Sequence, residues 1–285
     1  MMRYLFLFLS AASLLFTSCD GDISAAMFAG GDGTYDFKNE WLDSKYHVDE
    51  SKIHLLNFES DDDTVYSLYL GDFAQIATDT IIVYLHGNAA SMDQFWQTAG
   101  LFANLVDQHH YGFIMYDYRG FGWSTGQSTG AESMAADYDA VLEFLEDQGL
   151  TSDRMIVFAS SLGALAAGPA SAGGSRIPID KLVMEIPQST SNVIMQNTSG
   201  LSLPSSMITS YKFDIGEDLA NYDGELLWMH GTADKTAPYE TAKAAMYMHE
   251  GSYFTEAIYE DVGHGLRWAI GDEEWSRVVL EFIRH

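Results

Sequence analysis

Residues 155–164 read Met-Ile-Val-Phe-Ala-Ser-Ser-Leu-Gly-Ala and carry the strongest structural signal in the chain. An apolar, β-branched run ends at Ser160, and small helix-forming residues follow at once. This pattern predicts a β-strand that turns sharply into a helix, with Ser161 at the apex of the turn. Such a turn is strained and needs small residues two positions before and two positions after the serine. Ala159 and Gly163 meet that need, although glycine is the usual residue at the first of these positions.

Apolar runs and amphipathic segments alternate along most of the chain. Continuous apolar runs predict buried strands, which are residues 80–85, 111–116, 155–160, 182–186, 225–230 and 253–259. Residues 53–58 and 64–70 predict an antiparallel hairpin ahead of them. Apolar residues at helical spacing predict helices at residues 91–106, 131–148, 162–172, 238–250 and 273–283. This alternation predicts an α/β fold with a mainly parallel central sheet and helices on both faces.

Two stretches depart from the alternation. Residues 188–222 are rich in Ser, Thr, Asn and Met and contain Pro204, so we expect a short lid inserted there. Pro169 falls inside the helix predicted to follow Ser161. A proline at that position is expected to kink the helix or to end it early, which puts the geometry behind Ser161 in question.

The composition excludes several classes of partner. The 285 residues include 14 Lys and Arg against 41 Asp and Glu, which gives a net charge of −27. A field of this sign repels phosphate backbones, so we expect no nucleic-acid partner. It also repels anionic lipid headgroups, so attachment to a membrane needs a means other than a basic patch.

The N-terminal residues predict export. Residues 1–18 hold one arginine and then an apolar stretch too short to span a bilayer, as in a secretory signal peptide. The only cysteine, Cys19, follows at once, and Leu15-Phe16-Thr17-Ser18-Cys19 resembles a bacterial lipobox. The resemblance implies that Cys19 is lipidated and anchors the protein to a bacterial membrane, facing the periplasm or the cell exterior. The alternative is an ordinary signal cleavage that leaves Cys19 unmodified.

The folded part is expected to be one domain. Residues 19–40 mix Gly, Asp and Ser with little periodicity and predict a flexible tether. The domain is expected to start near Trp41 and to cover residues 41–285. Its oligomeric state is not predicted by any pattern in the chain.

Two loops carry the side chains that a serine nucleophile needs. Asp234 follows the predicted strand 225–230, and His264 follows the predicted strand 253–259. Because the carboxyl ends of parallel strands meet at one edge of a sheet, both side chains can reach Ser161. A neutral serine is a weak nucleophile, so an imidazole must take its proton and a carboxylate must orient the imidazole. These residues predict a catalytic triad.

Other polar residues near the predicted site compete for a role. Glu185 lies at a strand end, and Asp261 lies too close to His264 in sequence to reach the far side of its ring. Ser160 is expected to point away from the site. Asp117 and Arg119 are expected to hold a glycine-rich loop in place rather than to act on a substrate.

Together these features resemble serine hydrolases of the α/β-hydrolase superfamily, of a type with a short cap and a His-Gly-Asn loop. The resemblance covers residues 53–283, and its motifs are specific for fold and chemistry but not for substrate. The matching motifs are His86-Gly87-Asn88-Ala89, residues 116–126 (Tyr-Asp-Tyr-Arg-Gly-Phe-Gly-Trp-Ser-Thr-Gly), the turn at Ser161, the His-Gly-Thr-Ala-Asp run that ends at Asp234, and Gly263-His264-Gly265.

The resemblance implies an oxyanion hole made by the backbone N–H groups of Leu162 and Asn88, with Ala89 as the alternative to Asn88. It implies cleavage of small carboxylic esters, or of thioesters, through an acyl-enzyme on Ser161. We expect no metal and no cofactor. The alternatives are a peptidase or amidase of the same superfamily, and a catalytically silent binding protein on this scaffold.

Overall fold

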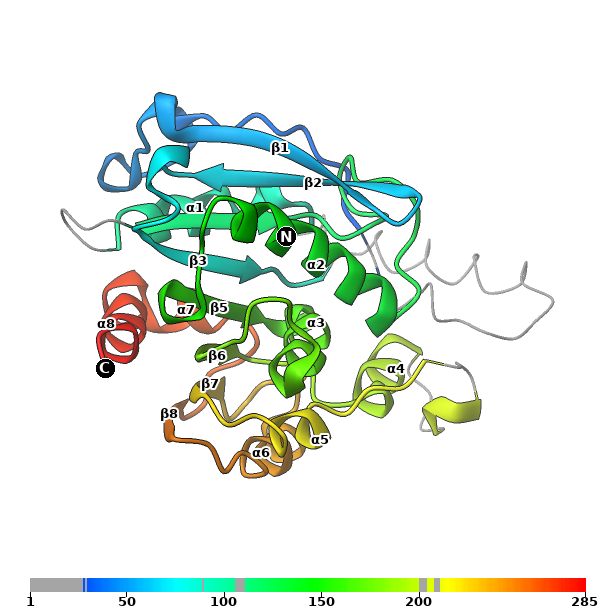
Figure 1. The fold of residues 1–285 in the computed structure, drawn as a ribbon. Coiled ribbons are helices and arrows are strands. Elements are labelled where there is room, and N and C mark those ends of the chain that lie inside the picture. The colour runs from blue at the N-terminus through cyan, green and yellow to red at the C-terminus, as the bar shows by residue number, and fades with distance from the viewer. Residues whose placement is uncertain (1–27, 29, 89, 106–110, 200–203, 208–210) are drawn as a thin grey trace, which may run out of the picture.

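The computed structural model describes residues 28, 30–88, 90–105, 111–199, 204–207 and 211–285, and within these residues eight strands form one mixed sheet (Figure 1). The strands are β1 (Ile53–Ser60), β2 (Asp63–Leu70), β3 (Thr80–Leu85), β4 (Tyr111–Tyr116), β5 (Met155–Ser160), β6 (Lys181–Glu185), β7 (Glu225–Gly231) and β8 (Tyr253–Tyr259). Their order in the sheet is β1-β2-β4-β3-β5-β6-β7-β8. The predicted strands are confirmed to within two residues at each end.

The direction of the strands follows the predicted topology. β1 and β2 form the expected antiparallel hairpin, and β2 also pairs antiparallel with β4. From β4 to β8 every neighbouring pair is parallel. The carboxyl ends of the parallel strands therefore lie along one edge of the sheet, where the loops with polar residues begin.

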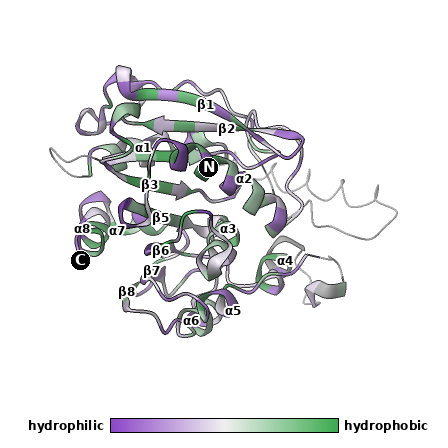
Figure 2. Ribbon diagram, viewed as in Figure 1, coloured by the Kyte–Doolittle hydropathy of each residue, from purple (hydrophilic) through white to green (hydrophobic). Residues whose placement is uncertain are grey.

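Helices cover both faces of the sheet. They are α1 (Trp96–Ala103), α2 (Ala131–Asp147), α3 (Ala164–Pro169), α4 (Ser191–Ser199), α5 (Ile215–Leu219), α6 (Tyr239–Met246), α7 (Leu266–Ile270) and α8 (Asp272–Ile283). Side chains alternate along a strand, so Val157 of β5 belongs to the core cluster that includes residues of α2, α3, α5 and α6, while Phe158 belongs to the one that includes residues of α1 and α8. Figure 2 shows hydrophobic residues along the strands and hydrophilic residues in many surrounding turns.

Pro169 ends the helix that follows Ser161, as predicted. The α-helical part of α3 stops at Pro169, and one π-helical turn (Ala170–Gly174) continues the chain. Gly173 closes that turn with a φ of +100°, a conformation that favours glycine. The disruption lies at the C-terminal end of α3, whereas the turn at Ser161 precedes the N-terminal end of that helix. Pro169 therefore does not alter the turn.

Residues 211–222, the last part of the expected lid, pack against the body of the domain. Thr190 and Asp214 form an isolated antiparallel bridge ahead of α5. Beyond it, Ile215 and Leu219 are fully buried, and α5 packs against α3 and α6. The polar composition of this stretch concealed the few apolar side chains that attach it to the core. Residues 215–222 of the expected lid are therefore part of the domain body.

The described part of the expected tether also packs against the domain. Tyr35 is buried, and its ring lies 4.3 Å from that of Trp123. Phe28 is buried against Tyr211, with 5.9 Å between the ring centroids. Aromatic side chains in a segment rich in glycine and aspartate give it enough apolar area to fold onto the body. The domain therefore begins before Trp41.

The predicted signal peptide (residues 1–18) and Cys19 lie outside the described residues. Among the helices that the structure describes, none has the length and apolar character needed to cross a bilayer.

Candidate active site

The turn between β5 and α3 has the strained geometry predicted from its sequence. Ser161 has a φ of +51°, which a residue with a side chain adopts at a cost of roughly 1–3 kcal/mol. A single turn of 3-10 helix (Ser161–Gly163) follows before α3 begins. A Cβ on Gly163 would lie 2.2 Å from the carbonyl oxygen of Leu85 in β3, so the position requires glycine. Ala159 is fully buried in β5, between neighbours on β3 and β6, and its methyl group fits there.

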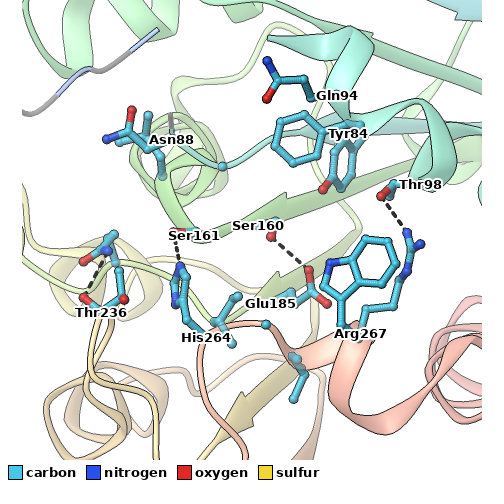
Figure 3. Close-up of a pocket in the computed structure, with 18 of the residues that line it drawn as sticks. Tyr84, Asn88, Gln94, Thr98, Ser160, Ser161, Glu185, Thr236, His264 and Arg267 are labelled. Carbon is cyan, nitrogen blue, oxygen red and sulfur yellow. Dashed lines mark hydrogen bonds between the residues drawn. The ribbon is translucent and has the colours of Figure 1, made fainter. Parts of the chain in front are cut away.

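Ser161, His264 and Asp234 form a continuous chain of hydrogen bonds. Ser161 Oγ lies 3.0 Å from His264 Nε2, as the dashed line in Figure 3 shows. His264 Nδ1 lies 2.7 Å from Asp234 Oδ2. With the Nδ1 proton donated to the carboxylate, Nε2 is left to accept the proton of the serine hydroxyl. Ser161 and Asp234 are buried, while the His264 side chain is 30% exposed and open to the cavity.

The surroundings of Asp234 keep it ionised. Burial raises the pKa of Asp234, but the hydrogen bonds from His264 and from the backbone of Ala237 and Thr236 outweigh it, so the pKa lies below its ordinary value. The two backbone N–H groups donate to Oδ1 at 2.9 and 2.8 Å and leave Oδ2 for the imidazole. Asp234 is therefore a fixed negative charge behind His264.

The loops after β7 and β8 are held against each other. The N–H of Ala233 donates to the carbonyl of Val262 at 3.0 Å. A Cβ on Gly231 would lie 2.2 Å from the same carbonyl oxygen, so only glycine allows the loops to come this close. This contact fixes the spacing between Asp234 on one loop and His264 on the other.

Neither competing acid contacts His264. Glu185 is buried at the end of β6 and accepts hydrogen bonds from Ser160 Oγ at 2.9 Å and from Trp275 Nε1 at 2.7 Å. Ser160 thus points away from the triad, as expected. Asp261 is exposed, and its backbone N–H donates to Thr232 Oγ1. Of the three acids considered, Asp234 is the one hydrogen-bonded to the imidazole.

The two predicted oxyanion donors lie on either side of the serine. Leu162 is the second residue of the 3-10 turn, where a backbone N–H has no partner within the helix. Gly87 brings the loop after β3 next to Ser161, because a Cβ on Gly87 would lie 3.6 Å from Ser161 Cβ. Asn88 follows and lines the same cavity, on the opposite side of Ser161 from His264 (Figure 3). Ala89, the alternative donor, lies outside the described residues.

Asp117 and Arg119 hold the surrounding loops, as expected. Asp117 Oδ1 accepts a hydrogen bond from the backbone of Met92 at 2.8 Å and lies 3.2 Å from His86 Nε2. It thereby holds the Met92 end of the loop that carries Asn88 and lies close to its other end at His86. Arg119 pairs with the buried Asp137 at 2.7 Å and so ties the loop after β4 to α2.

A cavity of about 670 Å³ opens above the triad and has a polar end that no sequence pattern indicated. Figure 3 shows this end extending from Ser161 past Ser160 and Glu185 toward Thr98. The residues that form it are Tyr84, Thr98, Ser160, Glu185, Arg267 and Trp275. They come from separate strands and helices, so only the folded chain brings them together. Gln188 also lines the cavity and was not predicted from the sequence. Its side chain donates to Thr236 O at 3.2 Å, and its backbone N–H donates to Ser161 O at 3.1 Å.

Comparison with known proteins identifies the fold. Residues 80–169, from β3 to the end of α3, match the model of a family described as alpha/beta hydrolase fold. The esterase Pf2001 of Pyrococcus furiosus superimposes with a TM-score of 0.68 at 15% identity, over 90% of this chain and 95% of that one. The chain has the α/β-hydrolase fold.

Other α/β-hydrolase structures are similar at comparable levels. The esterase RhEst1 from Rhodococcus sp. ECU1013 gives a TM-score of 0.61 at 19% identity, over 82% of this chain and 98% of that one. The bromoperoxidase from Bacillus anthracis gives 0.60 at 19% identity, over 81% of this chain and all of its own. Because proteins with different names share the fold, the reaction must be argued from the site.

A curated relative, "Uncharacterized protein YfhR" of Escherichia coli (strain K12), is 24% identical over 169 residues. The match covers 56% of this chain and 54% of the relative, so it spans about half the length of that protein.

Proposed function

We propose that the protein is a serine hydrolase that cleaves carboxylic esters through an acyl-enzyme on Ser161. The hydrogen-bonded chain from Ser161 through His264 to Asp234 carries the proposal. It lies at the floor of a cavity whose size is typical of sites for small molecules. The same geometry serves thioesters, which have the same acyl group on a better leaving group.

In the acylation step, Ser161 Oγ attacks the acyl carbon while His264 Nε2 takes the serine proton. The negative charge of Asp234 stabilises the imidazolium that forms. The carbonyl oxygen becomes an oxyanion and accepts hydrogen bonds from the backbone N–H groups of Leu162 and Asn88. One such donor contributes a factor of about 10²–10³ to kcat. Collapse of the intermediate breaks the bond to the alkoxide, which leaves as the alcohol with the proton from His264.

Deacylation repeats these steps with water as the nucleophile. His264 takes a proton from water as its oxygen attacks the acyl carbon, and the oxyanion again faces Leu162 and Asn88. Collapse breaks the bond to Ser161 Oγ, which regains the proton from His264. The carboxylic acid is released, and the triad returns to its starting state.

Two alternatives use the same scaffold. A peptidase or amidase would follow the same steps with an amine as leaving group. The similarity to structures named as esterases favours esters as the first class to test. A silent binding protein has no need of a serine held at a φ of +51° within hydrogen-bonding distance of an imidazole, so this geometry favours catalysis.

Labelling with a fluorophosphonate probe tests the proposed nucleophile. The wild type should be labelled, Ser161→Ala should not, and the matched variant Ser160→Ala should keep the label because Ser160 points away from the triad. An unlabelled wild type, or equal labelling of Ser161→Ala, would overturn the proposal. Hydrolysis of p-nitrophenyl esters of increasing acyl length, beside the matching anilides, then separates esterase from amidase activity.

We also propose that the protein is exported and anchored to a bacterial membrane through a lipidated Cys19. The short apolar leader and the position of the sole cysteine support this proposal. Mass spectrometry of the mature N-terminus tests it, with Cys19→Ser as the unlipidated control. A mature protein with an unmodified Cys19 would contradict it.

A further inference from the structure

Arg267 is a buried cation at the polar end of the cavity, and its partners occupy only part of its guanidinium. It is 7% exposed and lines the same cavity as Ser161 and His264. A guanidinium carries five N–H donors. Within the described residues, Arg267 makes one hydrogen bond, from Nη1 to Thr98 Oγ1 at 2.6 Å. Its Nε forms an ion pair with Asp272 Oδ1 at 3.0 Å, without the alignment of a hydrogen bond.

One end of the guanidinium has donors to spare. Nη1 donates to Thr98 and Nε faces Asp272, but Nη2 has no hydrogen-bond partner within the described residues. The guanidinium lies over the indole of Trp268, with 4.5 Å between Cζ and the ring centroid. The edge of a guanidinium bears its N–H groups. That edge suits a planar group with two acceptor oxygens.

The charges around the cavity favour an anionic acceptor. Among the described residues that line it, Glu185 is the one acid, against the cations Arg267 and Lys235, while Asp272, outside the lining, is ion-paired with Arg267. The lining of the cavity is therefore less acidic than the whole chain, whose net charge is −27. An anionic substrate would be repelled by the overall field, so a local positive charge is what would hold it in place.

Glu185 is a weak competitor for Arg267. Its two oxygens already accept hydrogen bonds from Ser160 and Trp275, and no ion pair within 4.0 Å joins it to Arg267 in the described structure. Burial raises the pKa of Glu185, and the hydrogen bonds from Trp275 and Ser160 and the charge of Arg267 act in the opposite direction. The guanidinium is therefore left with donors for a ligand.

We propose that the polar end of the cavity is a subsite for a carboxylate carried by the ester substrate, with Arg267 as its hydrogen-bond donor. The inference rests on the proposed esterase function and narrows it to esters of acidic molecules. Arg267 is a specificity-determining residue at some distance from the scissile bond, because Ser160 and Glu185 lie between it and Ser161 (Figure 3). The carboxylate belongs to either the acyl half or the alcohol half of the ester.

Matched pairs of esters test the subsite in the wild-type protein. For the acyl half, the pair is the p-nitrophenyl monoester of adipic acid and its terminal amide. For the alcohol half, it is para-carboxyphenyl acetate and para-carbamoylphenyl acetate. Each rate is divided by the rate of alkaline hydrolysis of the same ester. In one of the pairs, kcat/KM for the carboxylate should exceed that for the amide by about tenfold, as expected for a charge-assisted hydrogen bond in place of a neutral one.

Variants then assign the preference to Arg267. Arg267→Gln should bring the carboxylate-to-amide ratio close to one, and Arg267→Lys should keep part of it because it keeps the charge without the planar fork. The matched control is Arg176→Gln, which removes the same charge from an exposed group of ion pairs with Asp139, Glu143 and Glu146 and should leave the ratio unchanged. Thermal denaturation establishes which variants are folded. The carboxylate-to-amide ratio of the wild type tests the subsite even if a variant does not fold.

The outcomes separate this inference from the function on which it rests. If the wild type is labelled by the fluorophosphonate and hydrolyses neutral esters but shows no preference for a carboxylate in either pair, the subsite is wrong and the esterase stands. An equal preference in Arg267→Gln also overturns the role of Arg267. If the wild type is neither labelled nor active on any ester, the proposed function itself fails.

Discussion

The phenol of Tyr35 donates a hydrogen bond of 2.5 Å to Oδ2 of Asp117, across 82 positions of sequence. The other oxygen of Asp117 contacts both ends of the loop that carries Asn88, through Met92 and His86. The carboxylate of Asp117 thus links Tyr35 in the N-terminal segment to the loop of the proposed oxyanion hole. Burial and the neighbouring charge of Asp117 raise the pKa of Tyr35, so the phenol stays protonated and continues to donate.

Tyr35→Phe should therefore weaken both stability and catalysis. Removing the hydroxyl leaves Asp117 Oδ2 and the backbone N–H of Trp123 without this partner and should lower the free energy of unfolding by about 1–3 kcal/mol. A loosened Asn88 loop should lower kcat more than it changes KM, because the oxyanion forms only in the transition state. Urea denaturation and steady-state kinetics measure the two effects. Tyr259→Phe, which removes a half-buried tyrosine–carboxylate bond to Glu274, is the control and should lower stability without lowering kcat.

The strain at Ser161 gives a second prediction. Glycine adopts a φ of +51° without steric cost, so Ser161→Gly should be more stable than Ser161→Ala by about 1 kcal/mol. In an ordinary helix or strand the order of these residues is reversed. Both variants should be inactive. Their melting temperatures measure the difference, and a less stable glycine variant would show that the turn stores no strain.

The two small residues beside Ser161 should respond differently to substitution. Gly163→Ala places a Cβ against the carbonyl of Leu85, so it should cost about 1–3 kcal/mol and lower kcat by displacing Leu162. Ala159→Gly restores the more usual spelling of the motif but removes a buried methyl group, so it should lose about 1 kcal/mol and keep its activity. Chemical denaturation and ester hydrolysis compare the pair. Equal loss of activity in both would contradict a specific requirement at Gly163.

The sequence predicted the sheet and the three residues of the proposed triad because each signal is local. Ser161 directly follows a strand, Asp234 and His264 lie in the loops that follow two others, and strand ends meet at one edge of a parallel sheet. The polar end of the cavity was not predictable in this way. Arg267 and Thr98 come from α7 and α1, and their contact depends on how two helices pack. A single sequence contains no periodicity that reports such a contact.

The errors at the domain boundaries have a related cause. Tyr35 lies in a stretch whose average composition is that of a flexible tether, yet one buried phenol attaches it to Asp117. Ile215 and Leu219 do the same for the stretch expected to belong to the lid. Average composition reports whether a long segment can fold alone, but not whether a few side chains can dock it on a neighbouring core.

The carboxyl of Asp218 in α5 should make stability fall as the pH rises. Burial, with the nearby charges of Asp214 and Glu217, raises the pKa of Asp218 from 3.8 to about 6. Its Oδ2 packs closely against Gly168 of α3, where a Cβ would lie only 2.6 Å away. Between these two pKa values the folded protein retains a proton that the unfolded chain has released. The contribution of Asp218 to stability therefore declines from pH 3.8 to about 6 and stays low above that range.

Asp218→Asn removes this titration and keeps the shape of the side chain. Near neutral pH it should raise the free energy of unfolding by about 1–2 kcal/mol, which is less than the full shift would give because water reaches part of the group. Below the pKa of the unfolded carboxyl the variant and the wild type should be equally stable. Denaturation at both pH values measures the difference, with the exposed Asp62→Asn as control. A variant with the same advantage at both pH values would show that packing, and not the charge of Asp218, is responsible.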